Sequence, residues 1–131
     1  MIFYLIKLSY EAVSLRRRLE LKEFLENIFS LCESVKNDIE ELFSTVLMVA
    51  DKLNRETFKE FFLAIKSLRV RCREILSELK KLEKEIDEAL NTSDEDRKKE
   101  LYERLMGVQK ELISIRMRII ASARVIDSLK T

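Results

Sequence analysis

Arginines that could contact phosphate are concentrated in the middle of the chain. Residues 61–73 contain four basic residues and no carboxylate, and three of the four are Arg69, Arg71 and Arg73. Arginines clustered on a helical face can follow a nucleic-acid backbone, as they neutralise its phosphates. Arg116 and Arg118, further along the chain, are expected at nearby levels. These five arginines are therefore the candidate nucleic-acid contacts.

Ion pairing between neighbouring helices is the competing interpretation of the same arginines. In the register derived below, Asp38 is level with Arg69 and Glu111 is level with Arg73, as edge charges are in coiled coils. The 25 basic and 24 acidic residues give a formal net charge of only +1, so no global field attracts nucleic acid. We therefore expect ion pairs here, and a nucleic-acid-associated accessory subunit is the alternative function.

Carboxylates and thiols are the other groups with chemical potential. The acids between Glu78 and Glu88 suit a hard cation, but most lie beside lysines at spacings typical of a solvated helix face. Cys32 and Cys72 lack the CxxC spacing of a zinc site, and this predicts two buried free thiols. We expect no metal and no cofactor, with a carboxylate metal site formed between subunits as the one exception.

Several catalytic classes need residues that the sequence lacks. Histidine is absent, which excludes phosphorelay histidines, histidine-ligated haem, Glu-x-x-His di-iron sites and His-based triads. Proline is absent and Gly107 is the only glycine, so no glycine-rich loop can cradle a phosphate. The sequence therefore predicts a protein that is not an enzyme, and no catalytic residue is nominated.

Long helices must position these groups. The chain is 47% apolar, enough for one core, and is expected to be a single all-α domain over 1–131. Apolar residues recur in alternating steps of three and four over 58–89 and 101–129, which predicts two long helices. Over 21–53 the predicted apolar positions, which include Phe24 and Leu31, shift by one residue between Val35 and Ile39, which resembles a stutter. A helix break near Val35 is the alternative.

Capping residues place the turns between these helices. Asn54 stands three residues before Thr57, and Thr92 and Ser93 stand three before Glu95 and Asp96, which are spacings of helix starts. With turns centred between Leu53 and Asn54 and at Thr92, the apolar residues of neighbouring antiparallel helices fall at the same levels along the bundle. The predicted fold is an antiparallel bundle of three long helices of nearly equal length, at about 18–53, 55–90 and 94–130.

The N-terminal segment 1–17 has no matching partner in this three-helix body (18–131). Its spacing of Leu5, Leu8 and Leu15 does not continue into Leu21, so a kink is expected at Arg16–Arg18. The segment either folds back as a fourth short helix or forms a dimer interface. The candidate self-association residues are Ile2, Phe3, Tyr4, Leu5, Ile6, Leu8 and Tyr10.

The favoured function is a non-enzymatic helical interaction or scaffolding protein that self-associates, as a homodimer, and presents helix faces to an unidentified protein partner. The opening apolar stretch lacks a basic leader and a cleavage site, and no segment approaches the 20 or so apolar residues of a membrane span. A cytoplasmic location without membrane contact is therefore expected. High lysine and glutamate contents favour a thermophilic source.

Overall fold

The computed structural model describes the backbone of residues 2–129 and the side chains of residues 20–129. Its elements, in order, are helix α1 (Ile2–Met48), a short 3-10 helix η1 (Ala50–Lys52), helix α2 (Arg55–Leu90) and helix α3 (Glu95–Leu129). Over the described backbone there is no strand. The predicted all-α class and three-helix bundle are confirmed.

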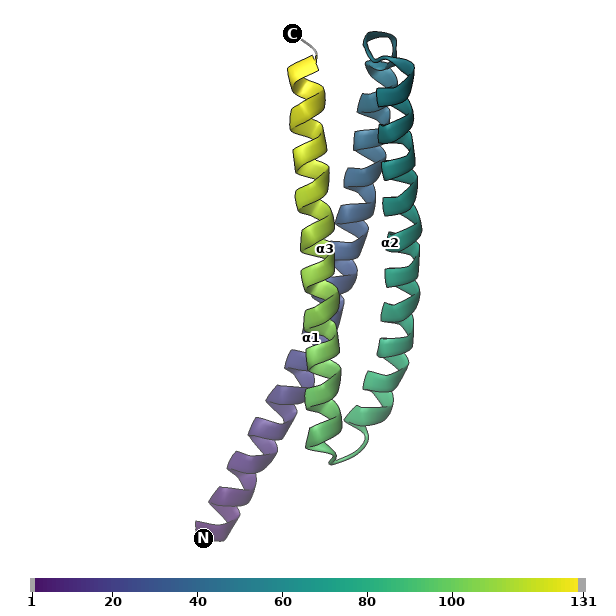
Figure 1. Ribbon diagram of the computed structural model, residues 1–131. Coiled ribbons are helices and arrows are strands. Elements are labelled where there is room, and N and C mark those ends of the chain that lie inside the picture. The colour runs from purple at the N-terminus through teal and green to yellow at the C-terminus, as the bar shows by residue number, and fades with distance from the viewer. Residues whose placement is uncertain (1, 130–131) are drawn as a thin grey trace.

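The three helices lie side by side, and the chain reverses direction at both turns (Figure 1). Helix α1 packs against both α2 and α3, and these two also contact each other. Phe24 meets Tyr102 with ring centroids 4.9 Å apart, and further along the same two helices Asp38 meets Arg116. Helices α1 and α3 therefore run in the same direction, with a fixed offset between their residues.

The buried stripe of α1 is an unbroken heptad seam, which corrects the predicted stutter. Leu25 and Cys32 are buried where the prediction had Phe24 and Leu31, which are only partly buried. With these two positions exchanged, the steps alternate between four and three throughout, and α1 continues without a break at Val35. The seam consists of Leu21, Leu25, Ile28, Cys32, Val35, Ile39, Leu42, Val46 and Val49.

The seams of α2 and α3 largely follow the predicted positions. The buried residues of α2 are Ile65, Leu68, Cys72, Ile75, Leu79, Leu82, Ile86 and Ala89. Those of α3 are Lys98, Leu101, Leu105, Leu112, Ile115, Ile119 and Ile126. Phe58, Phe61 and Val108 are partly buried against this core, whereas Leu129 is 40% exposed. The core therefore runs nearly the full length of the body.

The first turn begins earlier than predicted, because α1 ends at Met48 rather than at Leu53. No described residue has a positive φ, so the chain leaves the helix through the tighter winding of η1 rather than through a glycine cap. The predicted cap of the next helix is confirmed. The backbone N–H of Thr57 donates to Oδ1 of Asn54 over 2.8 Å.

The second turn uses a different capping residue from those predicted. The backbone N–H of Arg97 donates to Oδ1 of Asp94 over 3.1 Å, so Asp94 caps the start of α3. Thr92 instead donates its hydroxyl to the carbonyl of Ala89 at the end of α2. Thr92 therefore belongs to the end of the preceding helix, and the capping boxes predicted for Thr92 and Ser93 are wrong.

The N-terminal part of α1 is not a separate helix. Helix α1 runs without interruption from Ile2 through Arg16–Arg18 into the bundle. Figure 1 shows this part extending past the turn between α2 and α3 and away from the bundled body. Over the described backbone, residues 2–19 thus do not fold back as a fourth helix.

Candidate interaction surfaces

Arg69 is held by a carboxylate of the neighbouring helix. Its Nε and Nη2 donate to the two carboxylate oxygens of Glu40 over 2.8 and 2.7 Å. The guanidinium carbon also lies 4.4 Å from the ring centroid of Phe43. The hydrogen bonds from Arg69 lower the pKa of the Glu40 carboxyl, and Glu40 in turn raises the pKa of Arg69. The level predicted for this ion pair is nearly right, but Glu40 replaces Asp38 as the partner.

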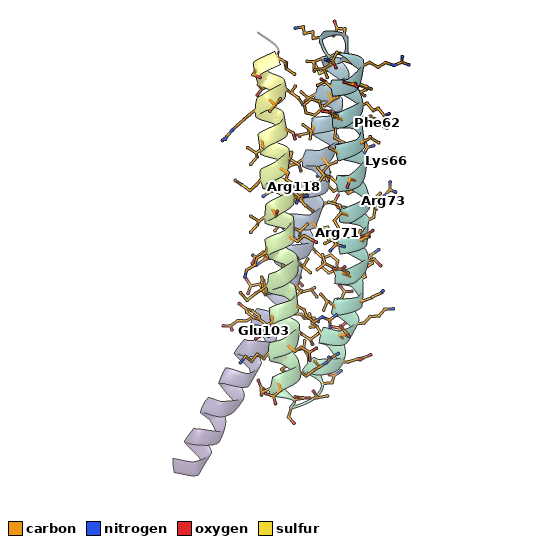
Figure 2. All side chains as sticks on the ribbon, in the orientation of Figure 1. Phe62, Lys66, Arg71, Arg73, Glu103 and Arg118 are labelled. Atoms are coloured by element: carbon orange, nitrogen blue, oxygen red, sulfur yellow. The ribbon has the colours of Figure 1, made fainter. Side chains whose placement is uncertain are left out.

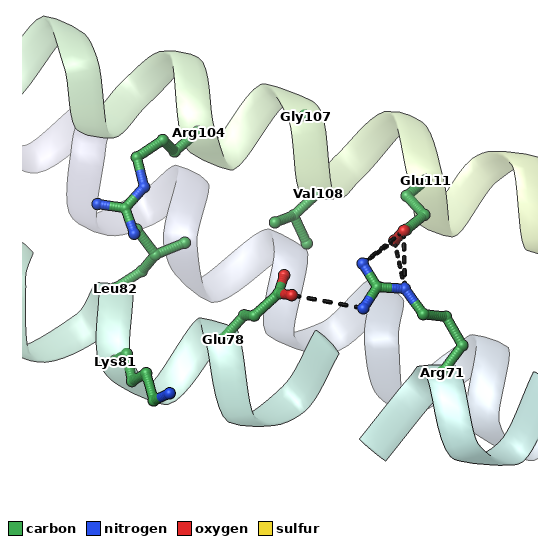
Figure 3. A pocket seen from close by; sticks show the side chains of 8 residues that line it. All are labelled: Arg71, Glu78, Lys81, Leu82, Arg104, Gly107, Val108 and Glu111. Atoms are coloured by element: carbon green, nitrogen blue, oxygen red, sulfur yellow. Dashed lines mark hydrogen bonds and ion pairs between the residues drawn. The ribbon is translucent and has the colours of Figure 1, made fainter. Parts of the chain in front are cut away.

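Arg71 is the centre of a larger charge cluster between α2 and α3 (Figure 3). It donates to both carboxylate oxygens of Glu111 over 2.6 to 2.9 Å. Its Nη1 also reaches Glu74 at 2.9 Å and Glu78 at 3.4 Å. Hydrogen bonding to Glu111, and next to Glu74, raises the pKa of Arg71. The predicted pairing of Arg73 with Glu111 is therefore wrong, because Arg71 occupies that position.

The remaining candidate arginines are not gathered into one basic band. Arg116 lies 3.3 Å from the Asp38 carboxylate and donates to the hydroxyl of Ser34, so it joins α3 to α1. Arg73 and Arg118 are exposed on α2 and α3 respectively (Figure 2). Three of the five candidate arginines are thus held by carboxylates of the same chain. The charge that would meet a phosphate backbone is largely compensated.

A shallow groove lined largely by charged side chains lies beside the Arg71 cluster. Figure 3 shows Arg104 and Lys81 at one end of it and Arg71 with Glu111 at the other. Gly107 forms part of the wall, and a Cβ placed there would meet no atom within 4 Å. The groove offers charged groups but no thiol or hydroxyl nucleophile. Within residues 20–129 no group of three or more carboxylate or thiol side chains is arranged to hold a metal ion.

The two cysteines are buried free thiols, as predicted. Cys32 on α1 and Cys72 on α2 line one pocket between the two helices, together with charged residues that include Arg69 and Arg73. Burial raises the pKa of both thiols, that of Cys72 to about 11. Neither thiol is therefore ionised at neutral pH, and the pair has the character of core side chains rather than of nucleophiles.

An exposed apolar stripe on α3 was not predicted from the sequence. Its members recur at helical spacing and are 37 to 60% exposed. The spacing places them on one side of α3, turned away from the core seam by about a third of a turn. Phe24 of α1 packs at one end of the stripe against Tyr102. We call this surface the α3 face, and it comprises Tyr102, Met106, Ile113, Met117 and Ile120.

A second exposed apolar surface surrounds the first turn. Met48, at the end of α1, is 78% exposed, and Phe62 of α2 is 42% exposed (Figure 2). The Phe62 ring lies 6.2 Å from that of Phe43 and 6.4 Å from that of Phe58, measured between centroids. We call this surface the turn patch, and it comprises Leu47, Met48, Phe62 and Leu63.

The predicted self-association residues lie in the N-terminal part of α1. Ile2, Phe3, Tyr4, Leu5, Ile6, Leu8 and Tyr10 all belong to this helix. Their side chains lie outside the part of the chain whose side chains are described. Their role in self-association therefore stays a prediction.

Comparisons with protein-family models, curated proteins and solved structures find no match to this chain. Among the described residues, no helix combines the length and apolar character needed to cross a membrane.

Proposed function

We propose that the protein is a non-enzymatic helical interaction protein that self-associates and presents helix surfaces to a protein partner. The α3 face is the observation that carries this proposal. Large contiguous apolar surfaces are rare on soluble monomers, and where they occur they commonly mark binding sites. Five large apolar side chains follow one side of α3, each at least 37% exposed.

The arrangement of apolar residues around α3 supports this proposal. A helix that only covers one core needs one apolar stripe and is polar elsewhere. Helix α3 has a buried seam, which includes Leu105 and Leu112, and a second stripe that includes Met106 and Ile113. Full burial of an exposed side chain of this size contributes roughly 1.5 to 3 kcal/mol, and these side chains, 37 to 60% exposed, have about half of that left to gain. A helix docked along the α3 face would therefore gain substantial free energy.

The charge pattern favours a protein partner over nucleic acid. Arg69, Arg71 and Arg116 already form ion pairs with Glu40, Glu111 and Asp38. A phosphate backbone would have to displace these carboxylates, and it would gain little net electrostatic energy by doing so. The nucleic-acid alternative thus has no specific observation in its favour.

The turn patch provides a second surface, separate from the α3 face. Its residues come from the end of α1 and the start of α2, at the end of the bundle opposite the turn between α2 and α3 (Figure 1). Aromatic and methionine side chains are enriched at protein interfaces. We assign the α3 face to self-association and the turn patch to the further protein partner.

Light scattering over a wide concentration range tests the proposal on the full chain. A mass above that of one chain is expected, and Ile113→Glu should weaken self-association because it places a charge within the α3 face. Val70→Glu is the matched control, since Val70 is 45% exposed on α2 and Ile113 is 47% exposed. A monomer at every concentration would contradict self-association. Equal effects of the two substitutions would contradict the assignment of the α3 face.

A titration with single-stranded and duplex oligonucleotides tests the alternative function. We expect no salt-dependent binding. Binding that weakens steeply with salt, and that disappears when the five candidate arginines are changed to glutamine, would favour a nucleic-acid subunit over our proposal.

A further inference from the structure

We infer that the α3 face, together with Phe24 and Leu31 of α1, receives residues 2–19 of a second copy of this chain. The two copies exchange these segments around a two-fold axis that crosses α1 close to Leu21, so each segment lies antiparallel to the α1 of its partner. This inference rests on the proposed self-association and specifies its contacts.

The sequence of the segment fits a helix that packs along a groove. Leu5, Leu8, Ala12, Leu15 and Leu19 alternate in steps of three and four, the spacing of a coiled-coil seam. This spacing is out of phase with the core seam that begins at Leu21 and Leu25. The sequence of residues 2–19 therefore carries an apolar pattern of its own, which does not continue the seam of the core. This second pattern calls for a separate partner.

The receiving surface has the matching length and composition. At 1.5 Å per residue, residues 2–19 span about 26 Å and the stretch from Tyr102 to Met117 spans about 23 Å. Phe24 and Leu31 are partly buried on α1, and Phe24 is in contact with Tyr102. Phe24 thus extends the α3 face onto α1 at the Tyr102 end. A third helix docked on this surface would complete a four-helix arrangement.

The continuity of α1 decides which copy covers this surface. Helix α1 is unbroken from Ile2 to Met48, and its N-terminal part points away from the body of its own chain (Figure 1). It cannot reach its own α3 face without breaking. The two-fold axis places residues 2–19 of a second copy on the first copy, antiparallel to its α1 from Leu21 onward and alongside its α3 from the start of that helix. The docked segment extends as far as Ile113 and Met117 of the first copy, and Ile120 lies beyond the end of the segment.

Charge complementarity supports the same pairing. Residues 2–19 contain four basic residues and one acid, whereas residues 20–41 contain seven carboxylates and two lysines. The antiparallel exchange places the basic segment of each copy beside the acidic stretch of the other. Pairing of the two N-terminal segments with each other would bring neither of them beside those carboxylates.

The exchange also buries enough surface for a stable dimer. Each docked segment covers a strip about 26 Å long and 10 Å wide, and the dimer contains two such contacts. Since both the segment and the surface beneath it lose contact with water, the dimer buries on the order of 1,000 Å² of accessible surface in total. This meets the usual lower bound for a specific interface. A single segment docked once would fall below it.

Photo-crosslinking between isotope-labelled copies tests the inference. Full-length chains carrying p-benzoylphenylalanine in place of Leu8 are prepared at natural abundance, mixed with ¹⁵N-labelled wild type and irradiated. We expect crosslinks that join a photoreactive chain to a ¹⁵N-labelled chain and that map between Tyr102 and Met117 of the labelled chain. The same photoreactive group in place of Lys80, exposed on α2, should give no such crosslink. In the full chain, Met106→Glu should weaken the dimer at least about tenfold and reduce the crosslink in proportion.

The outcomes separate this inference from the proposed function. Crosslinks to residues 2–19 of the other copy would show that the segments pair with each other, and crosslinks within one copy would show that they fold back. Either result, with a dimer still seen by light scattering, overturns the exchange but leaves self-association standing. A monomer without intermolecular crosslinks overturns both.

Discussion

The guanidinium of Arg71 holds the Glu111 carboxylate across the α2 and α3 interface, with Nη2 2.6 Å from Oε1. The same guanidinium contacts Glu74 and Glu78 of its own helix. Three carboxylates thus share one cation. Removing that cation would leave like charges facing each other in the groove of Figure 3.

Arg71→Gln should lower the free energy of unfolding by on the order of 1 kcal/mol, since about a third of each of the Arg71 and Glu111 side chains is exposed and the charges are partly screened. Arg73→Gln, on the exposed side of the same helix, should change it by less than about 0.5 kcal/mol. Urea unfolding followed by circular dichroism measures both. A loss for Arg73→Gln as large as that for Arg71→Gln would contradict the cluster's role.

Gly107→Ala should stabilise the protein. Gly107 lies inside α3 with no positive φ, and a Cβ at this position meets no atom within 4 Å. Alanine therefore gains helix propensity without a clash, and the expected increase is about 0.5 to 1 kcal/mol. Thermal unfolding monitored by circular dichroism shows whether the substitution raises or lowers the stability. A lower melting temperature would mean that the glycine has a role that the groove geometry does not reveal.

The ion pair of Glu40 with Arg69 should make stability depend on pH in the acidic range. The pKa of Glu40 is lowered from its ordinary 4.5, chiefly by the Arg69 hydrogen bonds, so the folded state binds this proton less readily than the unfolded state. The contribution is fully present above pH 4.5 and is lost as the pH falls through the lowered pKa. Glu40→Gln should therefore cost less than about 1 kcal/mol near neutrality and nothing in strong acid. Glu41→Gln is the control. If the free energy of unfolding of Glu40→Gln differed from that of the wild type by the same amount at every pH, this linkage would be excluded.

The thiols of Cys32 and Cys72 should react slowly in the native protein. The reactive species is the thiolate, and burial raises the pKa of Cys72 to about 11, so almost all of this thiol is protonated at pH 8. The reaction with a disulfide reagent at pH 8 should be about a hundredfold or more slower than after unfolding in urea. Native and unfolded rates of equal size would show that the thiols are accessible.

Lys98→Met should leave the stability unchanged or raise it. The Lys98 side chain is 9% exposed and continues the core seam of α3, with its Nζ 3.4 Å from Glu95. Replacing a buried charge by an apolar side chain of similar length removes its desolvation cost. Lys99→Met, on the exposed side, is the matched control for added apolar surface. A marked loss confined to Lys98→Met would assign a structural role to the ammonium group.

The class, the helix count and most of the core could be predicted because heptad spacing is a strong signal for a long helix. The first helix was harder to predict because apolar residues occupy adjacent positions in it. Phe24 and Leu25 compete for one seam position, and Leu31 and Cys32 for the next. Periodicity alone does not choose between such neighbours, whereas packing against two other helices does. The unbroken seam requires Leu25 in place of Phe24 and Cys32, as an apolar core residue, in place of Leu31.

The surfaces were less predictable than the core. The register placed Asp38 level with Arg69 and Glu111 level with Arg73, each two residues from the observed pairs Glu40–Arg69 and Glu111–Arg71. The choice between such neighbours depends on side-chain reach, which spacing does not specify. The α3 face had a visible signal in the spacing of Tyr102 and Met106 and of Ile113 and Met117. That signal was missed because one seam already accounted for the helix.

The length of α1 sets how far apart the proposed dimer would hold its partners. From Leu21 to Met48 the helix rises about 40 Å, so the two turn patches would stand roughly 80 Å apart on opposite ends of the assembly. With neither glycine nor proline in α1, the rod between them has no built-in hinge. A protein of this form would act as a spacer, fixing the separation between the two molecules bound at its ends.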